Sequence, residues 1–183
     1  IQRYTGVLYD ELDVSSLPTS AKKRLDHHVV IFSGLWGVLR CSDPIPDYKL
    51  KMGATIPVLG KLSSFWKPLL STALTDLTHC TVLDLLPNEH SAAWDPLIAC
   101  HRIRVYFKDQ VTSQDTSKKE PKLKTVSHWN KLLKGALVRH LLTGPEDGLT
   151  HLQAFKHSQG YVYRPDLTMT SGNTTDLTFV SLR

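Results

Sequence analysis

An apolar stripe between residues 61 and 77 constrains the fold of this chain more than any other feature of its sequence. Its members recur at helical spacing: Leu62, Phe65, Trp66, Leu69, Leu70, Ala73, Leu74 and Leu77. Pro68 lies inside the pattern and predicts a kink or a later helix start. Because a helix with one long apolar face has to bury it against another layer, the sequence predicts a layered globular fold.

A second amphipathic helix is predicted from His128 to Leu142. Its apolar side is predicted to carry Trp129, Leu133, Ala136 and Leu137. Its basic side is predicted to carry His128, Lys131, Lys134 and Arg139. The following Gly144-Pro145 ends the helix and starts a short one that runs to about Phe155.

Short β-patterns alternate with these helices. Buried strands are predicted within His27–Ser33, Thr81–Leu86 and His101–Phe107, a half-exposed strand at Tyr48–Met52 and another strand at Leu123–Ser127. A short helix is predicted after Pro18, an exposed tip or loop at Asp109–Pro121, and a hairpin formed by Gly160–Thr170 and Thr175–Leu182. The fold class is therefore mixed α/β (α+β-like): one domain spanning 1–183, with a central mixed sheet, flanking helices and a C-terminal β-hairpin.

The positive charge is concentrated in one stretch. The 183 residues include 22 Lys plus Arg and 17 Asp plus Glu, a net charge of +5. Residues 118 to 140 contain seven of the basic residues and one acid, a local +6 that leaves −1 for the rest of the chain. A local excess of this kind predicts an anionic ligand, with Lys131, Lys134 and Arg139 contacting phosphates.

The composition indicates in which compartment the protein is located. The longest apolar run, Val29–Leu39, is about half of what a membrane span needs, so no membrane partner is expected. Three scattered cysteines, Cys41, Cys80 and Cys100, do not form a disulfide framework and indicate a reducing compartment, which we take as the cytoplasm.

Two acids are candidates for proton transfer. Asp84 interrupts an apolar strand, and a buried carboxylate needs a partner. One reading makes it part of a structural salt bridge or a turn cap. The other pairs Asp84 or Glu89 with Lys131 for acid–base catalysis in a cleft.

The remaining candidates are single residues. Arg40, Lys49 and Lys51 are predicted to bind an anion, with Lys49 and Lys51 on one side of their strand, although Arg40 could instead cap a helix or pair with Asp43. Cys41 is either activated by Arg40 or an inert packing residue.

The nine histidines form no metal motif, so no metal or cofactor is predicted. The four tryptophans, Trp36, Trp66, Trp94 and Trp129, are predicted to lie in the core, with base stacking by Trp129 or Tyr48 as a secondary reading.

Several stretches, in order, resemble the YaaA family of bacterial peroxide-stress proteins. The block Ser33-Gly34-Leu35-Trp36-Gly37-Val38-Leu39-Arg40 carries most of the resemblance. It is supported by Tyr4-Thr5-Gly6, Asp43, Pro46, Tyr48, Met52-Gly53, Phe65-Trp66, Asp84-Leu85, Glu89, Ser127, Lys131, Lys134-Gly135, Arg139, Phe155 and Gly160-Tyr161. The resemblance implies a cytoplasmic bacterial protein of mixed α/β architecture with a positively charged cleft. It also implies association with limiting free iron and DNA damage under hydrogen peroxide, and with binding DNA.

The chain departs from the family pattern in two places. By this resemblance, the chain is expected to lack a longer N-terminal portion that the family links to DNA binding, and Cys41 stands where the family pattern usually has proline.

Two functions follow from these observations. The first is a YaaA-like response protein that binds double-stranded DNA or another phosphate-bearing ligand through a basic cleft. The alternative is an enzyme acting on a nucleobase, nucleotide or other small anionic substrate. In such an enzyme Arg40, Lys131 and Arg139 would bind the anion, and Asp84 or Glu89 would transfer protons.

The shape of the site distinguishes the two functions. An open basic groove favours the binding protein, and a closed pocket where Arg40, Asp84, Glu89 and Lys131 converge favours the enzyme. The sequence predicts no oligomeric state.

Overall fold

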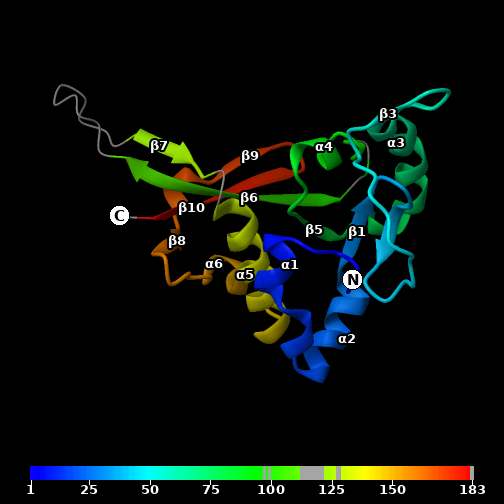
Figure 1. The fold of residues 1–183 in the computed structure, drawn as a ribbon. Helices are drawn as coiled ribbons and strands as arrows, with labels where there is room; N and C mark the ends of the chain where they lie inside the picture. Colours follow the sequence, from blue (N-terminus) through cyan, green and yellow to red (C-terminus); the bar gives the residue numbers. More distant parts are fainter. Residues whose placement is uncertain (97, 99, 112–121, 127–128, 182–183) are drawn as a thin grey trace. The chain divides into compact units, whose positions relative to one another are not determined.

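The structure is a computed structural model that describes residues 1–96, 98, 100–111, 122–126 and 129–181. The chain folds into helices and strands of the predicted mixed α/β class (Figure 1). It divides into two compact units, residues 1–3 with 23–102 and residues 4–22 with 103–183. Helix α2 (Thr19–His28) and strand β6 (His101–Val111) each contribute residues to both units.

The first unit is built around helix α3 (Leu62–Ala73), which confirms the predicted helix and contains Pro68. The predicted apolar stripe is correct only in part, because Leu62, Leu70 and Leu74 are buried whereas Leu69 and Ala73 are exposed. The 3₁₀ turn η2 (Thr75–Leu77) continues it, so the helical pattern extends to Leu77 as predicted. The other elements of this unit are β1 (Val30–Ser33), β2 (Gly37–Arg40), β3 (Thr55–Ile56), β4 (Gly60–Lys61), β5 (Thr81–Asp84) and α4 (Asn88–Ser91). Strands β1 and β2 form an antiparallel hairpin, and so do β3 and β4.

The core of the first unit gathers apolar side chains from α3, from β1 and from the segment that follows α4. Its buried members are Phe32, Met52, Leu70, Leu74, Ala93, Trp94, Ile98 and Cys100. The rings of Phe32 and Trp94 stack with centroids 6.3 Å apart. Half-buried side chains, including Trp66, pack around this cluster.

The strand predicted at Tyr48–Met52 is wrong as secondary structure, because these residues pair with no β-ladder of the described chain. Its alternation is nevertheless present, since Lys49 and Lys51 are exposed while Met52 is fully buried. The segment instead packs its backbone against Gly34, where an added Cβ would lie 2.6 Å from the Leu50 carbonyl oxygen. Alternation in burial therefore came from packing against a turn and not from a β-ladder.

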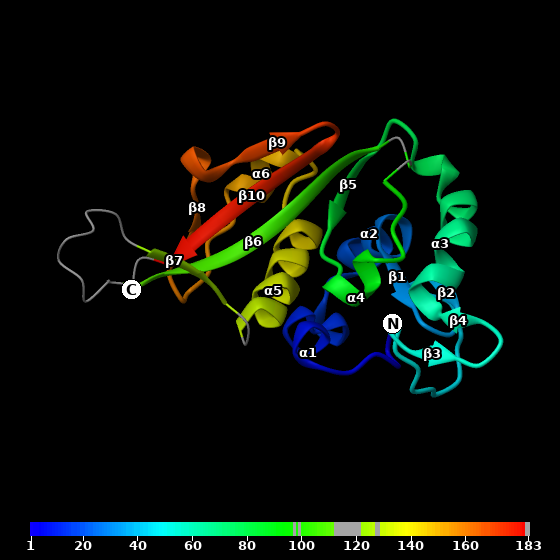
Figure 2. The ribbon, with the colours of Figure 1, turned by 90° about the horizontal axis from the view of Figure 1, so that it is seen from above.

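A six-stranded sheet contains the strand order β5-β6-β10-β8, with β7 added to β6 and β9 added to β10. The elements of the second unit are α1 (Val7–Leu12), η1 (Val14–Ser16), β7 (Lys122–Thr125), α5 (Trp129–Thr143), α6 (Leu149–Gln153), β8 (Tyr161–Tyr163), η3 (Pro165–Leu167), β9 (Met169–Ser171) and β10 (Thr174–Ser181). Helices α5 and α6 cover one face of its strands (Figures 1 and 2). Strands β9 and β10 form the predicted C-terminal hairpin and turn at Gly172.

Strand β6 confirms the predicted burial of Ile103, Val105 and Phe107, which are 1 to 3% exposed. The ring of Phe107 contacts Tyr161 and Phe179 with centroid distances of 5.8 and 5.5 Å. The start of the tip or loop predicted at Asp109–Pro121 is wrong, because Asp109–Val111 belong to β6, and residues 112–121 lie outside the described residues. Strands β6 and β7 pair in antiparallel fashion on either side of that segment.

Helix α5 is buried on two sides, whereas the sequence predicted a single apolar face. Leu133 and Leu137 are fully buried on the predicted side. On the opposite side Gly135 is also buried, and an added Cβ there would lie 2.2 Å from the Leu8 carbonyl oxygen of α1. Helix α1 therefore packs onto the middle of the arc that was predicted to be basic.

The tryptophan prediction is correct in part. Trp94 is buried and Trp66 is half-buried. Trp36 and Trp129 are 44% and 38% exposed, so placing these two in the core was wrong. The glycines on either side of Leu35-Trp36 form a turn that directs the indole of Trp36 outward.

Two histidines tie α5 to α6. The rings of His140 and His151 stack with centroids 3.9 Å apart. The Nε2 of His140 lies 3.1 Å from the His151 carbonyl oxygen, and the Nε2 of His151 lies 3.0 Å from the His140 carbonyl oxygen. Because a carbonyl only accepts, each Nε2 carries a hydrogen and donates it. Burial lowers the pKa of His140 below its usual value.

This pair makes the fold sensitive to acid. The unfolded chain takes up a proton on His140 near pH ~6.5, and the folded protein resists it. The contribution of His140 to stability is therefore complete above that pH and is lost as the pH falls below it. We expect the free energy of unfolding, from urea titrations at about pH 7.5 and 5.5, to depend less on pH in His140→Gln than in the wild type. The difference should be below ~1 kcal/mol because the ring is partly solvated.

The matched control for this experiment is His28→Gln at the exposed end of α2, which should keep the pH dependence of the wild type. If His140→Gln and the wild type showed equal pH dependence, protonation of His140 would not be the source of the acid sensitivity.

Candidate functional site

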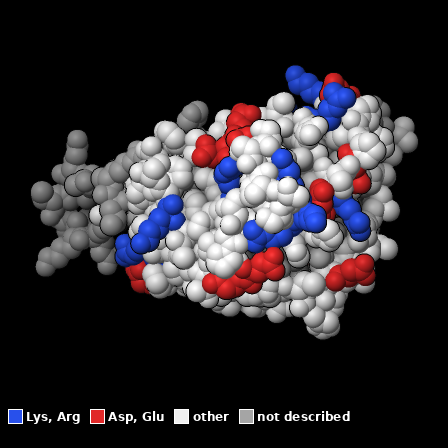
Figure 3. All heavy atoms as spheres, turned by 90° about the horizontal axis from the view of Figure 1, so that it is seen from below, with Lys and Arg blue, Asp and Glu red and all other residues white. Residues whose placement is uncertain are grey.

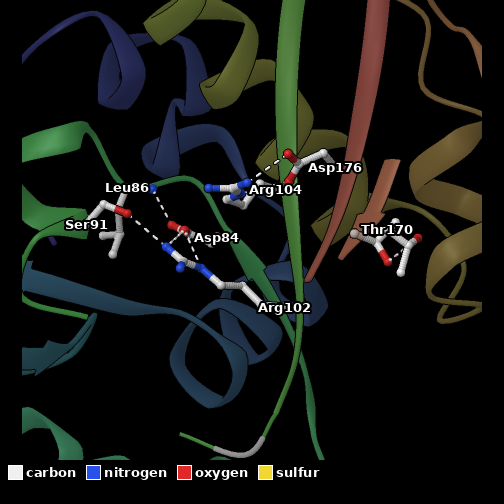
Figure 4. A network of polar contacts seen from close by, with 8 residues as sticks. Asp84, Leu86, Ser91, Arg102, Arg104, Thr170 and Asp176 are labelled. Atoms are coloured by element: carbon white, nitrogen blue, oxygen red, sulfur yellow. Dashed lines mark hydrogen bonds and ion pairs between the residues drawn. The ribbon is translucent and has the colours of Figure 1, made fainter. Parts of the chain in front are cut away.

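Asp84, at the end of β5, is the centre of a buried polar network in the first unit (Figure 4). Its side chain is 3% exposed, and that of Arg102 is 14% exposed. The Nε of Arg102 donates to Asp84 Oδ2 at 2.9 Å, and Arg102 Nη2 donates to the same oxygen. The main-chain N–H of Leu86 donates to Asp84 Oδ1 at 2.8 Å.

Arg102 is fixed by further contacts. Its Nη2 also donates to Ser91 Oγ at 2.8 Å, and its guanidinium lies over the ring of Trp94, 5.1 Å from the centroid. Asp84 is thus both an ion-pair partner and the acceptor of a turn N–H. The salt bridge and the turn cap that were predicted as structural alternatives for Asp84 therefore occur together. Each of its two carboxylate oxygens accepts a hydrogen bond.

Glu89 lies on α4, close to the backbone of Gly53, where an added Cβ would be 3.0 Å from Glu89 Oε2. The neighbouring His90 points its Nδ1 toward Glu89 Oε1 at 3.8 Å, too far for a hydrogen bond. This Nδ1 is buried and has no hydrogen-bond partner among the described residues. Burial lowers the pKa of His90, and the charge of Glu89 opposes that shift. Lys131 belongs to the other unit, so its pairing with Asp84 or Glu89 stays a prediction.

Arg40, Lys49 and Lys51 all have exposed side chains in the first unit. The carboxylate of Asp43 accepts the main-chain N–H of Arg40 at 2.8 Å, so these two residues are joined through the backbone of Arg40. Cys41 is buried, and burial raises the pKa of its thiol to about 11. Its thiol is therefore protonated at neutral pH, which favours the inert packing residue over the activated nucleophile.

The basic residues of α5 have different environments. Lys131 is exposed, whereas Lys134 is half-buried. Arg139 donates through Nη1 to the carbonyl oxygens of Leu12 and Asp13 at 2.9 and 3.0 Å, and through Nη2 to Ser16 at 2.9 Å. Its guanidinium thus satisfies carbonyls at the C-terminal end of α1. On the face drawn in Figure 3, basic side chains stand among acidic ones.

Among the described residues, no group of three His, Cys, Asp or Glu side chains is placed to hold a metal ion. None of the described helices is long and apolar enough to cross a membrane.

The fold and these side chains define a mixed α/β protein with a buried Asp84–Arg102 pair in one unit and a lysine-bearing helix in the other. A family model described as peroxide stress protein YaaA matches residues 1–167. The chain belongs to this family.

Curated relatives agree with this assignment. A UPF0246 protein of Streptomyces coelicolor is 38% identical over 160 residues, which are 84% of this chain and 57% of that protein. A UPF0246 protein of Corynebacterium glutamicum is 39% identical over 146 residues, covering 77% of this chain and 53% of the relative. One from Flavobacterium johnsoniae is 28% identical over 177 residues, covering 94% and 66%. The chain thus spans about half to two thirds of the length of these relatives.

The sequence predictions missed two residues of these sites, Arg102 and His90, and the exposure of Trp36. Arg102, the partner of Asp84, stands 18 positions away and has no local signal. His90 was one histidine among nine, and only its burial distinguishes it. The exposure of Trp36 had a readable signal, because a serine and two closely spaced glycines around Leu35-Trp36 are typical of a tight turn.

Proposed function

We propose that this YaaA-family protein binds double-stranded DNA, or another phosphate-bearing polyanion, and so limits oxidative damage. The observation that carries the proposal is the +6 net charge of residues 118 to 140 in a chain that is otherwise nearly neutral. Family membership supports the link to peroxide stress.

Among the basic residues of that stretch whose burial the structure describes, Lys124 on β7 and Lys131 on α5 are exposed. Lys134, one turn after Lys131 on α5, is half-buried and completes the proposed set. Arg139 would add to the local potential, but its guanidinium already binds carbonyls at the end of α1. Lysine contacts to phosphates fix a protein on DNA without reading its sequence, so we expect weak sequence preference.

A salt titration tests this proposal. The affinity for a 20-base-pair duplex of mixed sequence should fall steeply with salt, because each neutralised phosphate contributes about 0.9 to the slope of log K against log [salt]. Lys131→Ala/Lys134→Ala should therefore reduce the slope by about 1.8 and weaken binding at low salt. Fluorescence anisotropy at four salt concentrations measures both quantities.

The control removes the same charge elsewhere. Lys23 and Lys156 are exposed and lie outside the basic stretch, so Lys23→Ala/Lys156→Ala should keep the slope of the wild type. An unchanged slope in Lys131→Ala/Lys134→Ala would remove these lysines from the interface.

The enzymatic alternative depends on a different set of side chains. Asp84 is poorly suited to proton transfer because its two oxygens accept hydrogen bonds from Arg102 and Leu86. Glu89 would have to act instead, next to His90, whose Nδ1 has no hydrogen-bond partner among the described residues. The binding proposal needs neither residue.

A further inference from the structure

The turn between β1 and β2 presents two apolar side chains to solvent. Ser33 and Gly37 pair across this hairpin, and Leu35 and Trp36 between them are 39% and 44% exposed. Exposure of single apolar residues is common and needs no special reason. What distinguishes this turn is how firmly its backbone is held while the indole stays outside.

Hydrogen bonds fix the turn from within and from its neighbours. The side chain of Ser33, which is 1% exposed, accepts the main-chain N–H groups of Leu35 at 3.2 Å and Trp36 at 3.0 Å. The hydroxyls of Ser33 and Tyr48 are hydrogen-bonded at 2.6 Å. The Nε1 of Trp66 donates to the Gly34 carbonyl oxygen at 2.9 Å.

Close packing adds to this constraint. Gly37 has φ +74, and an added Cβ would lie 2.7 Å from the ring of Trp66. Gly34 has no room for a side chain either, since a Cβ would lie 2.8 Å from the main-chain carbon of Lys51. Both glycines are therefore required for the geometry. Because the turn is pre-organised, binding of a ligand to Trp36 costs little free energy for ordering the turn.

The same packing brings two cations next to the turn. Lys49 and Lys51 have exposed side chains and alternate with Leu50 and Met52, the latter fully buried. The segment that carries them packs against Gly34, two residues before Trp36. An exposed indole on a turn with a fixed backbone, together with two exposed lysines on the segment packed against that turn, has the composition of a site that stacks a base and neutralises the adjoining phosphates.

We propose that Trp36 is a stacking platform for an unpaired nucleobase, and that Lys49 and Lys51 bind the phosphates of the same single strand. Only an unpaired base offers a whole ring face to an indole, because the bases of a duplex are stacked on one another. The proposal goes beyond the duplex contacts inferred for α5, uses residues of the other unit, and stands or falls separately from them.

Binding of a 12-nucleotide thymidine oligomer tests this site. Trp36→Ala should weaken binding by about 5- to 150-fold, the loss expected for one stacked base. Trp36→Phe keeps an aromatic face and should stay within about threefold of the wild type. Lys49→Ala/Lys51→Ala should reduce the salt slope by about 1.4, or 0.7 for each single-strand phosphate.

An abasic oligomer of the same length separates stacking from charge. The wild type should bind it more weakly by a factor similar to the Trp36→Ala loss, and Trp36→Ala should lose nothing further on it. Val58→Ala removes a fully exposed apolar side chain from the β3–β4 turn of the same unit and should leave binding unchanged. Melting temperatures measured alongside show whether each variant is folded.

Two results would overturn the proposal. The first is a folded Trp36→Ala protein that binds the thymidine oligomer like the wild type. The second is wild-type protein that binds the abasic and thymidine oligomers equally well. Neither result bears on Lys131 and Lys134, which the duplex salt titration tests.

Discussion

Replacing Asp84 with alanine is expected to lower the free energy of unfolding by about 3–5 kcal/mol, because it leaves the charge of Arg102 buried without its partner. The side chains of Asp84 and Arg102 are 3% and 14% exposed, so water cannot replace the lost carboxylate without opening the structure. The main-chain N–H of Leu86 would lose its acceptor as well. Urea unfolding followed by tryptophan fluorescence measures the change.

A double variant separates the cost of an unpaired charge from the net worth of the ion pair. Asp84→Leu/Arg102→Met replaces both charges with apolar side chains and should recover most of the stability lost in Asp84→Ala. Asp166→Ala breaks an exposed ion pair with Arg164 and should leave the unfolding midpoint nearly unchanged. If Asp84→Ala unfolded within about 1 kcal/mol of the wild type, the pair would not be the structural centre that its burial indicates.

The sequence predicted those helices and strands in which buried side chains recur at a regular spacing. The helix at 61–77 and the buried side of β6 were readable, because burial on one face imposes helical or alternating spacing. The same reasoning failed at Tyr48–Met52. There the alternation comes from packing against Gly34, and periodicity alone does not distinguish that packing from a β-ladder.

The candidate sites depended on contacts that no local pattern contains. That Asp84 needs a partner followed from its apolar neighbours, but the identity of Arg102 did not. The basic face predicted for α5 assumed that only one side of the helix is covered. Arg139 instead binds the carbonyl oxygens of Leu12 and Asp13, more than 100 positions earlier in the chain. A helical wheel shows which residues share a face and cannot show which second helix covers it.

Gly135→Ala is expected to destabilise the protein by about 3 kcal/mol, the upper part of the range for overpacking, although the same change in an exposed helix stabilises by roughly 1 kcal/mol. The reason is the contact between α1 and α5. An added Cβ would lie 2.2 Å from the Leu8 carbonyl oxygen and 3.0 Å from Glu11 Cβ. A backbone oxygen cannot rotate away as a side chain can, so α1 itself has to move. That movement would also strain the bonds from Arg139 to the end of α1.

The sign of the effect makes this prediction decisive. Lys131→Gly, at an exposed position of α5, measures helix propensity without the contact and should cost about 1 kcal/mol. If propensity alone governed position 135, Gly135→Ala would gain about that amount, and its urea midpoint would rise. A lower midpoint, with amide hydrogen exchange accelerated in α1, is the result expected from close packing of the two helices. A raised midpoint would mean that α1 does not lie against α5 at Gly135.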